Sequence, residues 1–162
     1  MATIWQLIER RAGETPDDVM LIDESDRRVT FGEFRDHAAA LAAGLAGAGI
    51  GSESRVTWQL PSSIDAAITM AALSRLDAVQ CPVLHLYRKK ELGFVLKHTN
   101  AEYCIVPGEW KGFDYTAMAD ELAADLDPSP VVLTLGSLPT GDPSTLPPAA
   151  NPADGDEPVR WI

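Results

Sequence analysis

The fold is decided by residues 53–107, which read ESRVTWQLPSSIDAAITMAALSRLDAVQCPVLHLYRKKELGFVLKHTNAEYCIVP. Three short runs in this stretch are rich in β-branched, aromatic or apolar side chains and predict strands: residues 55–60, 78–83 and 102–106. Residues 62–76 and 87–98, which separate these runs, predict helices. Short strands that alternate with helices favour parallel pairing through right-handed crossovers. The sequence therefore predicts an α/β fold, a parallel sheet with helices on both faces.

The segments on either side continue this pattern. Residues 30–50 predict a helix, because Thr30 and Glu33 have the spacing of a capping box. The glycines at 47, 49 and 51 lie at the helix end and not between a strand and a helix, so they do not indicate a dinucleotide-binding loop. Further elements are expected as a helix at 3–12, strands at 19–22 and 27–30, a helix from Asp114 to about 126 and a strand at 131–135.

Several local features follow from residue type and spacing. The acidic tetrad at 23–26 lacks the ligand spacing and the glycine of a calcium loop, so it is expected to be a hairpin turn. Ser62 and Asp65 have cap spacing at the start of a helix. Gly13 is expected to stop the first helix, and residues 108–112 are expected to form a loop.

The composition bounds the class of protein. The 162 residues are enough for one domain with a hydrophobic core. A net charge of −11 argues against nucleic acid or an anionic membrane as the main partner, because both require a basic face. No apolar run approaches the roughly 20 residues of a membrane span, and Glu9, Arg10 and Arg11 place charges where a signal peptide is apolar. We therefore expect a cytoplasmic protein in which Cys81 and Cys104 are reduced core residues.

The C-terminal part differs in composition from the rest. Residues 136–158 are dense in Pro, Gly, Ser, Thr and Asp and predict an exposed, poorly ordered linker. Residues 159–162, VRWI, are typical of the start of a strand. The expected organisation is one α/β subdomain at 1–135, then this linker, then the first residues of a strand. A chain that stops at such a point is expected to be truncated.

The best candidate for a binding site is the turn after the second predicted core strand. Arg88, Lys89 and Lys90 stand at the start of the helix at 87–98, where cations oppose the helix dipole. His85 lies on the same turn, at the carboxyl edge of the sheet, where ligands bind in open parallel sheets. Anion binding and a solvated surface both remain open for the cations, and a structural role remains open for His85. No GxSxG elbow, P-loop or HExxH motif is present, so no catalytic or metal-binding residue is assigned.

Three segments in fixed order resemble the opening of the AMP-forming acyl-CoA synthetases, which belong to the adenylate-forming ligase superfamily. They are VTFGEF at 29–34 with AAAL at 38–41 and GIG at 49–51, SRVTWQLPSS at 54–63, and AALSRLDAVQCPV at 71–83. Each motif alone is weak, whereas their order and spacing together are specific. HLYRKKEL at 85–92 and WKGFDY at 110–115 look most similar to the branch of cyclohexanecarboxylate-CoA ligases and bacterial fatty-acid-CoA ligases. Asp77 stands where that family usually has glycine, and Ser62 where it usually has asparagine.

The resemblance implies the N-terminal subdomain of the adenylate-forming ligase fold. Such a ligase uses ATP and Mg²⁺ to activate a carboxylic acid as an acyl-AMP and transfers the acyl group to coenzyme A. The family's phosphate loop and its later ATP-binding and lysine motifs are absent from this sequence, so the chain alone is expected to be inactive and to bind no cofactor tightly. By resemblance, two segments flank the entrance for coenzyme A, and here they hold His85, Tyr87, Arg88, Trp110 and Lys111. Assembly into a homo-oligomer stays open.

Two other hypotheses for the function of this chain can be distinguished from the ligase hypothesis. A free-standing α/β interaction or regulatory domain would share the topology without catalysis, although residues 59–61 and 83–85 lack the aspartates of a phosphoacceptor receiver domain. A small nucleotide-binding enzyme is disfavoured by the missing glycine loop. The gene sequence after Ile162 separates them, because a Thr/Ser/Gly-rich loop there would favour the ligase and a stop codon would favour the free-standing domain.

Overall fold

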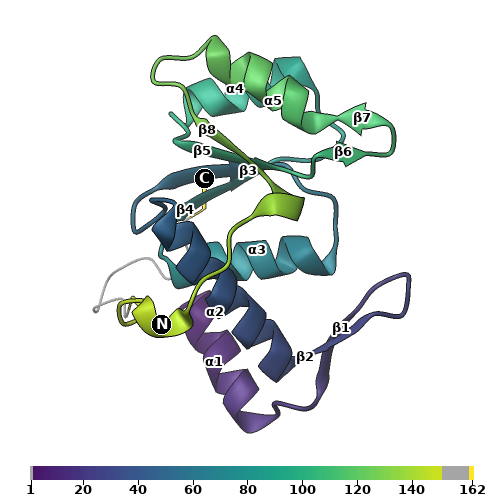
Figure 1. Ribbon diagram of the computed structural model, residues 1–162, viewed down its shortest axis with the longest axis vertical. Coiled ribbons are helices and arrows are strands. Elements are labelled where there is room, and N and C mark those ends of the chain that lie inside the picture. Colours follow the sequence, from purple (N-terminus) through teal and green to yellow (C-terminus); the bar gives the residue numbers. More distant parts are fainter. Residues whose placement is uncertain (1, 151–160) are drawn as a thin grey trace. The chain divides into compact units, whose positions relative to one another are not determined.

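The computed structural model describes residues 2–150 and 161–162 (Figure 1). The chain forms two compact units, each made of segments that alternate along the sequence. Unit 1 combines Met1–Ser52, Ser62–Ala78 and Pro139–Arg160. Unit 2 combines Glu53–Pro61, Val79–Leu138 and Trp161–Ile162. The subdomain expected at 1–135 and the boundaries of the linker stay a prediction. No helix in the described residues is both long and apolar enough to span a bilayer.

Unit 2 is built on a parallel sheet with the strand order β4-β3-β5-β8 (Figure 1). Its strands are β3 (Arg55–Trp58), β4 (Val79–Pro82), β5 (Tyr103–Val106) and β8 (Val131–Thr134). In the central register Thr57 pairs with Cys81 on one side and with Cys104 on the other. The predicted α/β class with a parallel sheet flanked by helices is confirmed, and each strand is one or two residues shorter than expected.

The last described residues join this sheet. Trp161 forms a parallel bridge with Gln80 of β4, and the Ile162 N–H donates to the Gln80 carbonyl at 3.0 Å. This is the place of the strand start expected at 159–162, of which residues 159 and 160 lie outside the described residues.

Two helices of unit 2 share one core with the sheet. They are α4 (Lys89–His98) and α5 (Tyr115–Ala124). Leu92 and Leu96 of α4 pack with Cys104 of β5 and with Met118 of α5, and all four side chains are buried. The helix expected from residue 87 begins later, with Arg88 as its N-cap, because the Glu91 carboxylate accepts a hydrogen bond from the Arg88 N–H at 3.2 Å.

The segment after β5 is a hairpin and not the loop expected at 108–112. Strands β6 (Glu109–Trp110) and β7 (Phe113–Asp114) pair antiparallel. The two residues between them, Lys111 and Gly112, have φ values of 50° and 74°. Positive φ at both central residues is what a type I′ turn requires, and this turn matches the twist of paired strands. Asp114 then caps α5 as expected, because its carboxylate accepts from the Ala117 N–H at 2.9 Å.

The described residues of unit 1 include three α-helices and a small antiparallel sheet. Its elements are α1 (Ile4–Glu14), β1 (Val19–Ile22), β2 (Arg28–Thr30), α2 (Phe31–Gly47) and α3 (Ile64–Arg75). The capping box of Thr30 and Glu33 is confirmed. Two local predictions are wrong. Helix α1 continues through Gly13, since a glycine near a helix end costs only about 1 kcal/mol relative to alanine. The N-cap of α3 is Ser63 and not Ser62, because Ser63 is the extended residue whose hydroxyl meets the Ala66 N–H.

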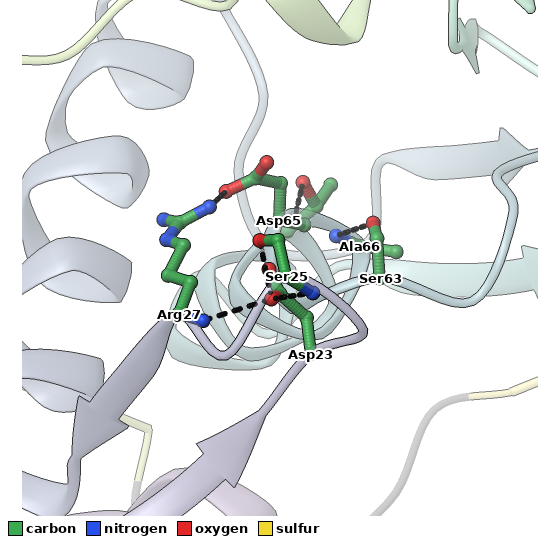
Figure 2. A network of polar contacts seen from close by, with 7 residues as sticks. Asp23, Ser25, Arg27, Ser63, Asp65 and Ala66 are labelled. Carbon is green, nitrogen blue, oxygen red and sulfur yellow. Dashed lines mark hydrogen bonds and ion pairs between the residues drawn. The ribbon is translucent and has the colours of Figure 1, made fainter.

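The acidic tetrad is a hairpin turn, as predicted (Figure 2). One carboxylate oxygen of Asp23 accepts hydrogen bonds from the Ser25 N–H, the Ser25 hydroxyl and the Arg27 N–H, at 2.7–3.0 Å. The Ser25 hydroxyl contributes most to lowering the pKa of Asp23 from its ordinary value. Arg27 forms an ion pair with Asp65 at 3.0 Å, which joins the turn to the first turn of α3.

The described part of the expected linker is mostly exposed and contacts α2. The Gly141 N–H donates to the Ala40 carbonyl at 2.9 Å. A Cβ atom placed on Gly44 would lie 1.9 Å from the Pro139 carbonyl oxygen, so this glycine allows the segment to approach the helix. A short 3₁₀ turn, η2 (Pro143–Thr145), follows. Residues 151–158 of the expected linker lie outside the described residues.

Candidate functional site

The candidate site lies in unit 2, at the edge where its parallel strands end. The turn after β4 carries His85 and Arg88, and the β6–β7 hairpin after β5 carries Trp110 and Lys111. The carboxyl ends of parallel strands meet at one edge of a sheet, which is where open α/β sheets bind ligands. The two segments therefore approach each other although about 25 residues separate them in sequence.

Aromatic and cationic side chains from the turn and the hairpin form one cluster. The His85 ring meets the Trp110 ring edge to face, with centroids 4.8 Å apart. The Arg88 guanidinium lies 4.3 Å from the centroid of the Phe113 ring, and the Lys111 ammonium lies 4.5 Å from that of Trp110. Cations at such distances from ring faces are attracted by the ring quadrupole. The structure thus brings together four of the five predicted site residues.

Tyr87 is the predicted residue that faces elsewhere. Its side chain is exposed and lines a shallow groove along α4, beside Lys90, Phe94 and Lys97. Phe94 is 67% exposed, so an apolar ring is presented to solvent in the lining of this groove, which also includes two lysines and Glu91. Tyr87 is therefore a sequence neighbour of Arg88, but its ring forms no aromatic or cation–π contact with the described residues of the cluster.

The Arg88 side chain organises the turn as well as presenting a charge. One guanidinium nitrogen donates to the His85 carbonyl at 2.9 Å and to the Tyr87 carbonyl at 2.8 Å. Neither cation forms an ion pair with a residue that the structure describes, but Lys111 differs from Arg88 because its ammonium donates no hydrogen bond to a described residue. Of the two cations, Lys111 is therefore the one whose charge is less committed to local structure.

Three residues of the site were missed from the sequence. Phe113 and Tyr115 supply ring faces for Arg88, and their signal was their place beside Trp110 in WKGFDY. Gln59 is fully buried beneath the turn and donates to two of its carbonyls. Its only signal was an amide in the otherwise apolar end of a predicted strand.

The surroundings of both cysteines disfavour the thiolate, the form that acts as a nucleophile. Burial raises the pKa of Cys104 to about 12, with a smaller contribution from the charge of Asp120. Burial also raises the pKa of Cys81. Both thiols are free and buried. Within residues 2–150 and 161–162, no group of three or more His, Cys, Asp or Glu residues could hold a metal ion. The arrangement at the edge is suited to binding flat or anionic groups through rings and cations.

Comparison with known proteins relates this chain to one enzyme family. The model of the family described as AMP-binding enzyme matches residues 8–160. The chain is 32% identical over 149 residues to the 2-hydroxy-7-methoxy-5-methyl-1-naphthoate–CoA ligase of Streptomyces carzinostaticus, a match that covers 92% of this chain and 26% of that protein. It is 33% identical over 127 residues to the salicyl-AMP ligase/salicyl-S-ArCP synthetase of Mycobacterium tuberculosis, covering 76% of this chain and 22% of that protein.

Solved structures show the same fold. The N-terminal subdomain of Klebsiella oxytoca NpsA, in complex with 3-hydroxybenzoyl-AMSN, matches with a TM-score of 0.70 at 24% identity, over 85% of this chain and 31% of that one. The chain spans about a quarter of the length of the curated relatives it matches. Both relatives are named for aryl acids, so the branch of cyclohexanecarboxylate or fatty-acid ligases expected from the sequence is not specifically supported.

Proposed function

We propose, from the premise that this chain belongs to the AMP-binding enzyme family, that it is the N-terminal part of a ligase that activates an aryl acid as its acyl-AMP. The observation that carries the proposal is the match over 92% of the chain to a ligase named for a naphthoate. A cyclic or fatty acid is the second candidate for the substrate, on the resemblance of residues 85–92 and 110–115. The proposed location is the cytoplasm.

The proposed reaction has two steps. The carboxylate of the acid attacks the α-phosphorus of ATP, which forms acyl-AMP and releases pyrophosphate. A thiol then attacks the acyl carbon, and AMP leaves as the thioester forms. ATP and Mg²⁺ do not fit the described residues, which include no phosphate loop and no cluster of metal-binding side chains. We propose that both are held by residues outside this chain.

The proposed contribution of this chain to binding concerns the thiol substrate. Coenzyme A and the pantetheine arm of a carrier protein share a thiol and phosphate groups. His85, Tyr87, Arg88, Trp110 and Lys111 are proposed to stand at the rim of the thiol entrance. The support is chemical, because Lys111 offers a cation for phosphate and Trp110 offers a ring face at the same edge of the sheet.

The test uses the protein that contains this chain, purified whole. Pyrophosphate release is measured with ATP, Mg²⁺ and a panel of acids: salicylate, benzoate, a naphthoate, cyclohexanecarboxylate and octanoate. We expect release that depends on the acid and is fastest with an aryl acid. Coenzyme A and a pantetheinylated carrier protein are then compared as thiol acceptors. Fastest release with octanoate or cyclohexanecarboxylate would overturn the aryl assignment. No acid-dependent release with any acid would favour the free-standing interaction domain.

A further inference from the structure

Gln59 follows the last residue of β3 and is fully buried. Its backbone N–H donates to the Ile105 carbonyl of β5 at 2.9 Å, which fixes its backbone to the sheet. Its side-chain nitrogen donates to the Leu84 carbonyl at 2.9 Å and to the Tyr87 carbonyl at 3.1 Å. Both hydrogens of the amide are therefore directed at the turn between β4 and α4.

The two leucines of this turn bury little of their side chains. Leu84 is 60% exposed and Leu86 is 70% exposed. Its backbone is held instead by polar contacts. The Tyr87 N–H donates to the Leu84 carbonyl at 3.0 Å within the turn, and the Tyr115 hydroxyl donates to the His85 carbonyl at 2.8 Å from α5. Gln59 supplies the contact from the sheet itself.

Burying the amide of Gln59 costs free energy unless the amide forms hydrogen bonds. A buried amide without hydrogen-bond partners destabilises the fold by about 1–3 kcal/mol through desolvation. An amide at this position therefore has to donate its N–H hydrogens to nearby acceptors. An apolar side chain would fill the same volume without that requirement. The carbonyl oxygen of Gln59 has no hydrogen-bond partner in the described residues, which leaves the two donated bonds as the favourable polar contacts of this side chain.

We propose that Gln59 is a positioning residue that presets the conformation of residues 84–88 and thereby the places of His85 and Arg88 at the carboxyl edge. Its effect on the binding of a thiol substrate rests on the proposed function above. Its effect on the conformation of the turn does not.

The test of the turn is amide hydrogen exchange in the full chain, comparing the unsubstituted protein with Gln59→Met. Methionine is unbranched and of similar size, and it cannot donate. The matched control is Gln80→Met, because Gln80 is a second buried glutamine, on the neighbouring strand, and its side-chain oxygen accepts from the Trp58 indole at 3.1 Å. We expect exchange at Tyr87 to become about tenfold faster in Gln59→Met only, the size of one or two lost hydrogen bonds.

Exchange at Ala101, whose N–H bonds to Leu96 in the same unit, reports on general loosening and is expected to stay unchanged. Unchanged exchange at Tyr87, or an equal rise at Tyr87 and Ala101, would overturn the proposal. If Gln59→Met does not fold, Gln59→Asn replaces it, since its amide is one methylene too short to reach both carbonyls. The same two outcomes then decide.

The functional arm uses the whole protein that contains the chain. Gln59→Met is expected to raise the KM for the thiol substrate about tenfold and to leave acid-dependent pyrophosphate release within twofold. Gln80→Met is expected to change neither. An equal loss in both steps for Gln59→Met would reduce Gln59 to a residue of general stability. If the unsubstituted protein releases no pyrophosphate, the proposed function fails, and hydrogen exchange still decides the role of Gln59.

Discussion

The Tyr115 hydroxyl donates a hydrogen bond to the His85 carbonyl at 2.8 Å, across 30 residues of sequence. Tyr115 is the first residue of α5 and is buried, whereas His85 lies on the turn after β4. This bond joins the turn to the end of the β6–β7 hairpin. It therefore links the two segments that carry the candidate site.

Replacing Tyr115 by phenylalanine should remove this hydrogen bond and leave the buried ring in place, so no large cavity forms in the core. We expect the free energy of unfolding to fall by about 1 kcal/mol, the net value of one buried hydrogen bond. Urea unfolding measures it. Tyr103→Phe is the matched control, because the Tyr103 hydroxyl forms no hydrogen bond within the described residues. Equal losses in the two variants would contradict this role for the hydroxyl.

Replacement by alanine should have opposite effects on stability at two glycines of α2, Gly44 and Gly47. A Cβ on Gly44 would meet the Pro139 carbonyl oxygen at 1.9 Å, and backbone must move to relieve it. Gly44→Ala is therefore expected to destabilise the protein by about 1–3 kcal/mol and to speed proteolysis within residues 139–150. Gly47, the last residue of α2, has nothing within 4 Å of such an atom. Gly47→Ala should be neutral or stabilising by up to about 1 kcal/mol.

Lys111 is the cation expected to matter most for a phosphate-bearing thiol. In the whole protein, Lys111→Ala should raise the KM for coenzyme A or a carrier protein about fivefold, a loss of about 1 kcal/mol. Pyrophosphate release should be unaffected. Lys97→Ala, an exposed lysine on α4 in the same unit, controls for the change in net charge. The same rise in KM for both variants would point to general electrostatics and not to a site.

Cys104 should make stability depend on alkaline pH. Burial raises the pKa of its thiol from the ordinary 9.0 to about 12, so between these values the unfolded chain loses a proton that the folded chain keeps. The stability from this group is therefore complete below about pH 9 and declines toward pH 12, by at most about 1.4 kcal/mol per pH unit. Urea unfolding at pH 8 and pH 10 should show a smaller pH-dependent loss in Cys104→Ala than in the unsubstituted chain. Identical pH dependence in both would refute this.

The 162-residue chain by itself is expected to form no acyl-adenylate, because its sequence contains no phosphate loop. Pure chain is assayed for pyrophosphate release with ATP, Mg²⁺ and the acid preferred by the whole protein. Sustained turnover that survives repurification would show that this chain suffices for the first step.

The sheet and the position of the candidate site could be predicted because they depend on local patterns. Three apolar runs separated by helices predicted the parallel strands β3, β4 and β5, and Thr30 with Glu33 predicted the start of α2. The direction of parallel strands then placed the segments of His85 and Trp110 at one edge. Capping and alternation act between neighbours in the chain, so the sequence by itself determined the α/β class, the parallel pairing and the edge at which the candidate segments meet.

Only the tertiary structure decided how the side chains at that edge are used. It directs Arg88 onto the carbonyls of its own turn and onto the Phe113 ring, and it sets Gln59 beneath the turn. It also turns Lys111 and Gly112 into the tip of a hairpin. These contacts and the hydrogen bond from Tyr115 to His85 join residues up to 30 positions apart, and their geometry depends on how β3, β4 and α5 pack together. A buried amide can donate to whichever carbonyl packing brings near, so its partner is a property of the folded core and not of the local sequence.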